Sequence, residues 1–247
     1  NILQEKGLIH EGLHKGWYSV SDETFYPETQ IEQFTDPVLN TQQHRSKETK
    51  STVAYQEETN YFFRLSDFQD NLIEHLERNP SFIVPPSKYQ QLLAELKSNK
   101  LPDLSISRPS SRLTWAIDIP NDPLQKMYVW FEALVNYLTS AGFPESFKLH
   151  NGSDGEKSYT KVGNFKQNPW PATHVVGKDI IRFHAIYWPI LLMAAGIELP
   201  HQVVVHSHWL SDGFKMSKSL ENVVDPQKVA SYYGTDPFRF FVMEYST

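Results

Sequence analysis

The sequence contains no cysteine among its 247 residues. A disulfide framework, a thiolate-bound zinc or iron–sulfur centre and a cysteine nucleophile are therefore excluded, and the composition fits a reducing, intracellular environment. Neither G-x-G-x-x-G nor G-x-x-x-x-G-K occurs among the 11 glycines. The usual glycine-rich phosphate-binding loops are therefore absent as well.

Long apolar runs and an excess of basic charge are also missing. No stretch reaches the roughly 18 uncharged apolar residues of a membrane span, so we expect no membrane association. The 23 basic and 29 acidic side chains give a formal charge of −6, which argues against non-specific coating of nucleic acid. The 40% hydrophobic and 13% aromatic content indicates a chain that folds around an ordinary core.

Residues 1–104 are polar and rich in aromatic side chains, and we expect them to form a module of their own. Two helical repeats lie inside it, one that Ser66 could cap and one between Pro86 and Pro102. We predict that these two helices pack against each other as a hairpin. Their inner faces would carry Phe68, Leu72, Ile73 and Leu76 in the first and Tyr89, Leu92, Leu93 and Leu96 in the second.

Strands and helices alternate in residues 105–210. A strand over 127–130 leads into a helix, and a short buried strand over 173–176 leads through a turn at Gly177 into a longer helix that ends at Gly196. The valine run 203–205 is typical of a central parallel strand that is covered on both faces. The pattern predicts an α/β fold with half of a doubly wound parallel sheet, whose ligands bind at the carboxyl ends of the strands.

Two lysines three residues apart follow the valine run. Lys215 and Lys218 enclose Met216 and Ser217, and Ser219 follows them. Lysine acts on phosphate as a flexible point charge, so this loop could neutralise the charge that builds on a leaving pyrophosphate. The alternative for a generic K-x-x-K is a solvated surface loop.

Two helical faces combine aromatic side chains with small or hydrogen-bonding ones. Such stripes are by default part of a core, but together they could also enclose a slot with aromatic walls. The first stripe is Trp130, Ala133 and Tyr137, and the second is Ile180, His184 and Trp188.

These segments together resemble the methionyl-tRNA synthetases, a family of class I aminoacyl-tRNA synthetases. The five residues from Lys215 to Ser219 match the second class I signature, K-M-S-K-S, letter for letter. The resemblance continues along the whole chain, which makes it specific. It includes G-W-Y-S-V-S-D-E-T-F at 16–25, N-Y-F-F-R-L-S at 60–66, M-Y-V-W-F-E-A-L-V-N-Y at 127–137 and G-K-D-I-I-R-F-H at 177–184.

The resemblance implies the second half of a class I synthetase Rossmann-type doubly wound sheet with an inserted α+β connective module. The implied divisions are the module at 1–104, the sheet half at 105–210, and the lysine loop with the start of a helical stem-contact region at 211–247. The first signature, H-I-G-H, and an anticodon-binding domain are not found between Asn1 and Thr247. We therefore expect an internal piece of a longer polypeptide that is inactive alone.

The implied activity is the activation of methionine by ATP, with Mg²⁺ on the phosphates, followed by transfer of the methionyl group to tRNA. In this reading the two aromatic stripes enclose the methionine side chain. The implied ATP contacts are Gly177, Asp179, His206, Lys215, Met216, Ser217, Lys218 and Ser219, and the implied catalytic residues are Lys215, Lys218 and Arg108.

Several of these residues have plainer interpretations. Asp179 could cap a helix, Arg108 could form a surface salt bridge, and His184 could be a satisfied core histidine. His206 and His208 share one face of a strand end, but no third ligand lies close in the sequence, so we do not expect a metal there. Glu221 would add negative charge near the phosphates and could slow activation.

Ser19 and Asp22 stand where many members of the family have zinc-binding cysteines. One serine and one aspartate make a poor tetrahedral zinc site, so we predict no zinc. This zinc-free form resembles the bacterial-type and mitochondrial branch, which implies the mitochondrial matrix or a bacterial cytoplasm. Two alternatives stay open: a non-catalytic tRNA-binding or assembly protein with this fold, and a synthetase for valine, leucine or isoleucine.

Overall fold

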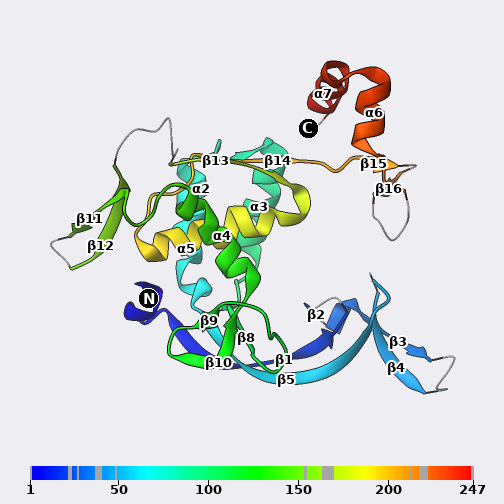
Figure 1. Ribbon diagram of the computed structural model, residues 1–247. Helices are drawn as coiled ribbons and strands as arrows, with labels where there is room; N and C mark the ends of the chain where they lie inside the picture. Colours follow the sequence, from blue (N-terminus) through cyan, green and yellow to red (C-terminus); the bar gives the residue numbers. More distant parts are fainter. Residues whose placement is uncertain are drawn as a thin grey trace. The chain divides into compact units, whose positions relative to one another are not determined.

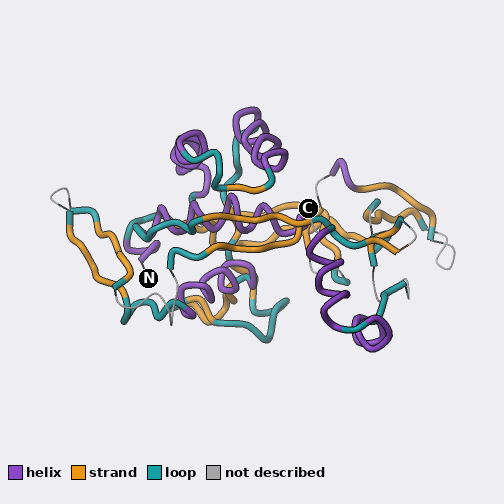
Figure 2. The backbone as a smooth tube through the Cα atoms, turned by 90° about the horizontal axis from the view of Figure 1, so that it is seen from above, coloured by secondary structure: helices purple, strands orange, loops and turns teal. Residues whose placement is uncertain are grey.

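A computed structural model describes residues 2–21, 24–26, 28–36, 41–47, 49–152, 155–162, 170–211, 213–216 and 222–245. Runs of consecutive strands are separated by helices along this part of the chain (Figure 2). The chain divides into two compact units, which are Asn1–Arg64 with Asp103–Glu132, and Leu65–Pro102 with Ala133–Thr247.

The first unit is built on two long antiparallel strands (Figure 1). β1 (Ile9–Ser19) pairs with β5 (Thr52–Phe63), with Ile9 opposite Phe63 at one end and Tyr18 opposite Ala54 at the other. The sheet continues in the order β2-β1-β5-β4-β3, and β7 also pairs with β5. The added strands are β2 (Thr24–Tyr26), β3 (Ile31–Thr35), β4 (Gln42–Ser46) and β7 (Leu104–Ser105).

A smaller antiparallel sheet, in the order β8-β10-β9, completes this unit over the described residues. Its strands are β8 (Ser107–Pro109), β9 (Asp118–Ile119) and β10 (Asp122–Met127). The strand expected at 127–130 is wrong in its extent, because β10 ends at Met127 and Trp130 lies in the next helix. The amide of Tyr128 still donates to Ile106 O, but Phe131 N already donates to Tyr128 O, which begins the helical turn.

The second unit contains the parallel sheet, in the order β13-β14-β6. β13 (Thr173–Gly177) runs in register with β14 (Gln202–His206), and β14 pairs on its other side with β6 (Ile83–Val84). The predicted strands at 173–176 and 203–205 are thus confirmed, with β14 between parallel neighbours. Val203 and Val205 are buried, as a central strand requires.

The crossover between β13 and β14 is the long helical segment expected after Gly177. It consists of a 3₁₀ turn, η3 (Lys178–Ile180), a π-helical turn, η4 (Phe183–Tyr187), and α5 (Trp188–Ala195). The segment ends at Gly196, as expected, with φ of +72°. A Cβ there would lie 2.2 Å from Lys157 O, so both the backbone angle and the space require glycine.

The predicted helix pair is present, but it does not stand apart from the parallel sheet. α2 (Gln69–Arg78) and α3 (Pro86–Ser98) pack against each other with Leu72, Leu76, Leu92 and Leu96 buried. Ser66 does not cap α2, because it lies inside a 3₁₀ turn, η2 (Leu65–Phe68), and α2 begins at Gln69. The pair flanks β6, so it belongs to the second unit. The functional divisions at 1–104, 105–210 and 211–247 stay predictions.

The remaining elements are short hairpins and helices. No described helix combines the length and the apolar character that crossing a bilayer requires. The elements are α1 (Ile2–Glu5), η1 (Glu28–Gln30), α4 (Val129–Ser140), the hairpins β11 (Phe147–Asn151) with β12 (Lys157–Lys161) and β15 (Leu210–Ser211) with β16 (Phe214–Lys215), α6 (Pro226–Tyr233) and α7 (Thr235–Glu244).

Candidate functional site

Aromatic and imidazole rings from three elements meet in the second unit. Tyr137 comes from α4, His174 from β13, and His184 and Trp188 from the helical segment that follows β13. His184 is 2% exposed, His174 5% and Trp188 1%. The centroid of the Tyr137 ring lies 5.6 Å from that of His184 and 6.0 Å from that of Trp188. The structure therefore brings together three of the six residues of the predicted stripes.

The hydrogen bonds of His184 indicate where the proton of its neutral ring lies. Its Nδ1 lies 3.0 Å from Ile180 O, and a carbonyl oxygen can only accept, so Nδ1 carries the proton. The Oη of Tyr137 lies 2.7 Å from Nε2 of the same ring and donates to it. Burial lowers the pKa of His184 and raises that of Tyr137, so both groups stay uncharged.

The stripe on α4 is only partly buried. Leu134 and Leu138 are the buried residues of this helix, whereas Ala133 is exposed and Trp130 and Tyr137 are half-buried. Tyr137 packs against the buried rings of His174 and Trp188, so a ligand contact of this stripe stays a prediction. In the second stripe the π-helical turn changes the regular spacing. Ile180 reaches His184 through its backbone carbonyl instead.

The sequence did not single out His174, which lies at the centre of the cluster. The indole Nε1–H of Trp188 donates to its Nε2 at 3.2 Å, and its ring centroid lies 4.3 Å from that of Tyr137. Burial, with a smaller effect of the nearby His184, lowers the pKa of His174 to about 4. The available signal was its position two residues before the buried Val176 on a strand that ends at the Gly177 turn.

The turn after β13 forms a second part of the site. In the register of the two strands Gly177 lies opposite His206, so both carboxyl ends reach the same edge of the sheet. Asp179 lies within η3 and its Oδ1 is 3.1 Å from His208 Nε2. A Cβ on Gly177 would lie 2.8 Å from that same Oδ1. A side chain at position 177 would therefore displace the carboxylate of Asp179 from this position.

A pocket of about 360 Å³ lies beside this turn. It mixes cationic, acidic and apolar side chains from α3 and from the segment after Gly177, and the ion pair between Arg182 and Glu95 joins the two. Its lining consists of Lys88, Gln91, Leu92, Glu95, Lys178, Asp179, Ile181, Arg182 and His208. His206 lies outside this lining, and its Nδ1 is 2.9 Å from Ser207 O.

The lysine loop is described only in part. Lys215 is in β16, whose backbone pairs with β15, and Met216 lines an apolar pocket of about 800 Å³ with residues of α6 and α7. Ser217, Lys218 and Ser219 lie outside the described residues, as do Glu221 and Asp22. The predicted phosphate contacts of this loop thus stay predictions.

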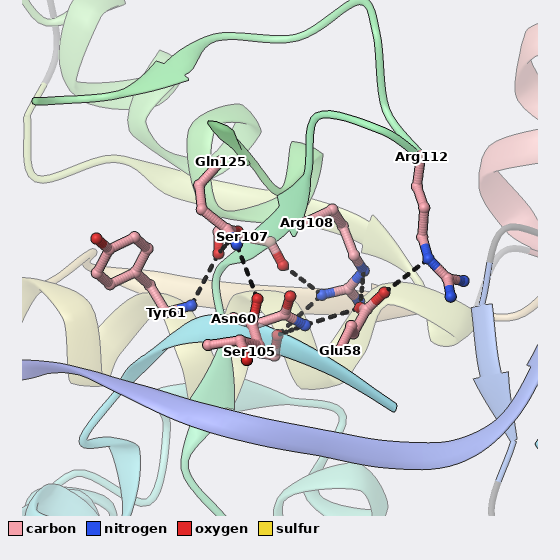
Figure 3. A network of polar contacts seen from close by, with 9 residues as sticks. Glu58, Asn60, Tyr61, Ser105, Ser107, Arg108, Arg112 and Gln125 are labelled. Atoms are coloured by element: carbon pink, nitrogen blue, oxygen red, sulfur yellow. Dashed lines mark hydrogen bonds and ion pairs between the residues drawn. The ribbon is translucent and has the colours of Figure 1, made fainter. Parts of the chain in front are cut away.

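Arg108 belongs to a buried polar network in the first unit (Figure 3). Its side chain is 13% exposed, and it donates to Ser105 Oγ at 2.8 Å and to Ser107 O at 2.7 Å. Glu58 lies 3.7 Å from Arg108 Nε and 3.1 Å from Arg112 Nε. The arginine is thus part of a buried ion pair and not of a surface salt bridge, and burial lowers its pKa.

Hydroxyl groups surround Ser19, at the position where many members of the family carry a zinc-binding cysteine. Ser19 is fully buried, and its Oγ donates to Ser51 Oγ at 3.0 Å and lies 3.1 Å from Ser21 Oγ. Thr49 Oγ1 lies 2.7 Å from Ser51 Oγ, which extends the cluster. Over the described ranges, no group of three or more His, Asp or Glu side chains is placed to hold a metal ion.

The whole chain, residues 1–247, matches a family model described as tRNA synthetases class I (M). The chain belongs to this family. A structure of Mycobacterium tuberculosis methionyl-tRNA synthetase bound by methionyl-adenylate is 39% identical and has a TM-score of 0.77, covering 98% of this chain and 43% of that one. The α/β fold with a Rossmann-type sheet that the sequence predicts for this family is thereby confirmed.

Curated members of the family are also similar in sequence. The mitochondrial methionine–tRNA ligase of Candida albicans is 60% identical over 247 residues, which are 100% of this chain and 41% of that protein. The Saccharomyces cerevisiae enzyme of the same name is 51% identical, over 99% of this chain and 44% of its own length. The chain thus spans about two fifths of the length of these relatives.

Proposed function

We propose that this chain is part of a mitochondrial methionyl-tRNA synthetase and that its second unit binds methionine and one side of ATP. The observation that carries the proposal is the neutral, ring-lined cluster in which Tyr137 donates to His184. The family match and the mitochondrial relatives support the same assignment. A neutral pocket accepts an uncharged side chain and rejects charged ones, because an unpaired charge would be buried there.

The stripe on α4 supplies the rest of the proposed methionine pocket. Tyr137 is aromatic, and a thioether gains about 0.3–1.5 kcal/mol from contact with a ring edge. Trp130 belongs to the first unit, and its contact with methionine stays a prediction of the sequence. Ala133, the small residue of the stripe, is exposed. Ile180, His184 and Trp188 form the opposite wall in this proposal. Shape selection of this kind is worth about 1–3 kcal/mol per methylene.

The turn after β13 is the proposed nucleotide contact. The backbone of Gly177 and the carboxylate of Asp179 lie at the carboxyl edge of the parallel sheet, where an adenosine ribose can donate to Asp179. His206 ends the neighbouring strand opposite Gly177. Lys215 and Lys218 would neutralise the leaving pyrophosphate, with Met216, Ser217 and Ser219 in the same loop.

The described residues do not present a dedicated Mg²⁺ site, because no three carboxylate or imidazole groups are gathered among them. Mg²⁺ is commonly held through one or two carboxylates and substrate phosphates. We therefore assign no step to the ion and expect it to accompany ATP. Zinc is not part of the proposal, because hydroxyl groups surround Ser19.

The proposed reaction has two steps. The carboxylate of methionine attacks the α-phosphorus of ATP, which forms methionyl-adenylate as pyrophosphate leaves. A terminal ribose hydroxyl of tRNA then attacks the acyl carbon and AMP leaves. The pocket contributes mainly by holding the amino acid in line with the phosphate, which is an entropic gain.

The test is ATP–pyrophosphate exchange by the full-length protein. We expect exchange that depends on methionine and is not supported by valine, leucine or isoleucine. Exchange with one of those amino acids would contradict the assigned substrate. If the folded full-length protein catalyses exchange with none of these amino acids, the result would favour the alternative of a non-catalytic tRNA-binding protein.

A further inference from the structure

His174 lies on β13, between Tyr137 of α4 and His184 of the helical segment after Gly177. It points to the same side of β13 as the buried Val176 and is 5% exposed. Its ring centroid lies 4.3 Å from that of Tyr137, on α4, and 5.7 Å from that of His184, on the segment after Gly177. A change in this side chain would therefore be transmitted to both walls.

The hydrogen bond from Trp188 determines which nitrogen of His174 carries the proton. An indole N–H donates and cannot accept, so the 3.2 Å bond requires an unprotonated Nε2 on His174. If His174 carried a second proton, its Nε2–H would point at the indole N–H of Trp188, which is also a donor. The ring would then also be positively charged beside His184. The low pKa of His174, about 4, agrees with this geometry. The ring is a neutral acceptor at neutral pH.

We propose that His174 is a positioning residue for the amino-acid pocket. Its Nε2 fixes the indole of Trp188, and its ring face supports Tyr137, so the two walls keep their spacing without His174 touching the substrate. The inference rests on the proposed function, which makes this pocket the methionine site. Losing the acceptor would leave the buried indole N–H unpaired, and Trp188 would move to find another partner.

Two substitutions separate the acceptor from the volume of the ring. His174→Leu keeps much of the volume but removes the acceptor, whereas His174→Gln offers an amide oxygen near the position of Nε2. In ATP–pyrophosphate exchange by the full-length enzyme, we expect His174→Leu to raise the KM for methionine roughly tenfold. The KM for ATP should stay unchanged. We expect His174→Gln to recover most of the loss.

A double-substitution cycle tests whether His174 acts through Trp188. Trp188→Phe removes the same hydrogen bond from the other side, so adding His174→Leu to it should raise the KM for methionine little further. Fully additive effects would overturn the proposal. Equal defects in His174→Leu and His174→Gln would also overturn it, as would a parallel rise in the KM values for methionine and ATP.

A spectroscopic readout keeps the proposal testable without catalysis. In full-length protein with ¹⁵N-labelled tryptophan, the Trp188 indole proton, assigned with Trp188→Phe, should exchange slowly with solvent. His174→Leu should speed that exchange and His174→Gln should not. Unchanged exchange in His174→Leu would refute the positioning role. A wild-type protein that shows slow indole exchange but no methionine-dependent activity would refute only the proposed function.

Discussion

The hydroxyl of Tyr137 is the polar group that α4 contributes to the cluster. It donates a hydrogen bond to His184 Nε2 at 2.7 Å. Tyr137→Phe keeps the ring wall but leaves that buried nitrogen without its donor. A lost hydrogen bond of this kind costs about 0.5–1.5 kcal/mol. We expect the KM for methionine in ATP–pyrophosphate exchange to rise about three- to tenfold, with the KM for ATP unchanged.

The matched control for this substitution is Asn136→Ala, at the neighbouring exposed position of the same helix. It should leave both KM values unchanged, because Asn136 lies off the stripe. A similar rise in Asn136→Ala, or no rise in Tyr137→Phe, would contradict the role given to the hydroxyl.

The two buried imidazoles predict how stability depends on pH. The pKa of His174 falls from 6.5 in the unfolded chain to about 4 in the folded one, and burial lowers that of His184 in the same direction. Between these pH values the unfolded chain binds more protons, so stability is complete above pH 6.5 and falls as the pH approaches 4. From pH 7 to pH 5, we expect His174 to contribute a loss of about 1–2 kcal/mol.

Urea unfolding of the full-length protein at the two pH values measures this loss. His174→Gln removes one titrating group, so its stability should fall less between pH 7 and pH 5 than that of the wild type. A variant with an equal or steeper fall would show that other groups carry the dependence.

The turn between β13 and η3 can be tested by adding one methyl group. Gly177 has φ of −69°, so alanine fits the backbone, but its Cβ would crowd Asp179 Oδ1 at 2.8 Å and His208 Nε2 at 3.0 Å. We expect Gly177→Ala to raise the KM for ATP several-fold and to leave the KM for methionine unchanged, in contrast to Tyr137→Phe. Exchange assays with each substrate varied in turn measure the difference. A defect confined to methionine would contradict the nucleotide role.

The elements that the sequence predicted well are those with strong local patterns. The strand at 173–176 and the valine run at 203–205 are β-branched segments next to glycine or polar residues, and the structure confirms both as parallel strands. The end of α5 at Gly196 was equally clear. These signals lie within a few residues of each other, so no distant contact is needed to detect them.

The elements that the sequence missed depend on distant partners. β6 has two residues, Ile83 and Val84, which is too short to show a period, and it is a strand only because β14 lies beside it. The sequence pattern does not indicate His174 either, because its role also depends on distant partners. Its importance comes from Trp188, fourteen positions along the chain, and from Tyr137 on another element. A single histidine in an apolar strand carries no local sign of such partners.

The network around Glu58 is another feature that the sequence predicts only in part. The resemblance implies a catalytic role for Arg108, and the structure places its guanidinium beside the Glu58 carboxylate. The shared position of Arg112 and Asn60 beside Glu58 follows from the pairing of the strands, which no local pattern specifies. Removing Glu58 would leave the largely buried guanidinium of Arg108 without its counter-charge, so the network also contributes to the stability of the unit.

For the whole molecule, the account predicts stability without zinc. The hydroxyls of Ser19, Ser21 and Ser51 bond to one another, so no metal should be needed to hold this part of the first unit. We expect incubation of the full-length protein with EDTA or phenanthroline to leave its unfolding temperature unchanged, and metal analysis to find no stoichiometric zinc. A drop of several degrees, or one bound zinc per chain, would contradict this.

The central claim is that Tyr137 on α4 and His184 on the segment after β13 contact the side chain of one bound amino acid. A crystal structure of the full-length protein with a non-hydrolysable methionyl-adenylate analogue tests it most directly. The account predicts the thioether against Tyr137 and His184, with the ribose beside Asp179. An analogue bound elsewhere, with these rings packed against other parts of the protein, would contradict it.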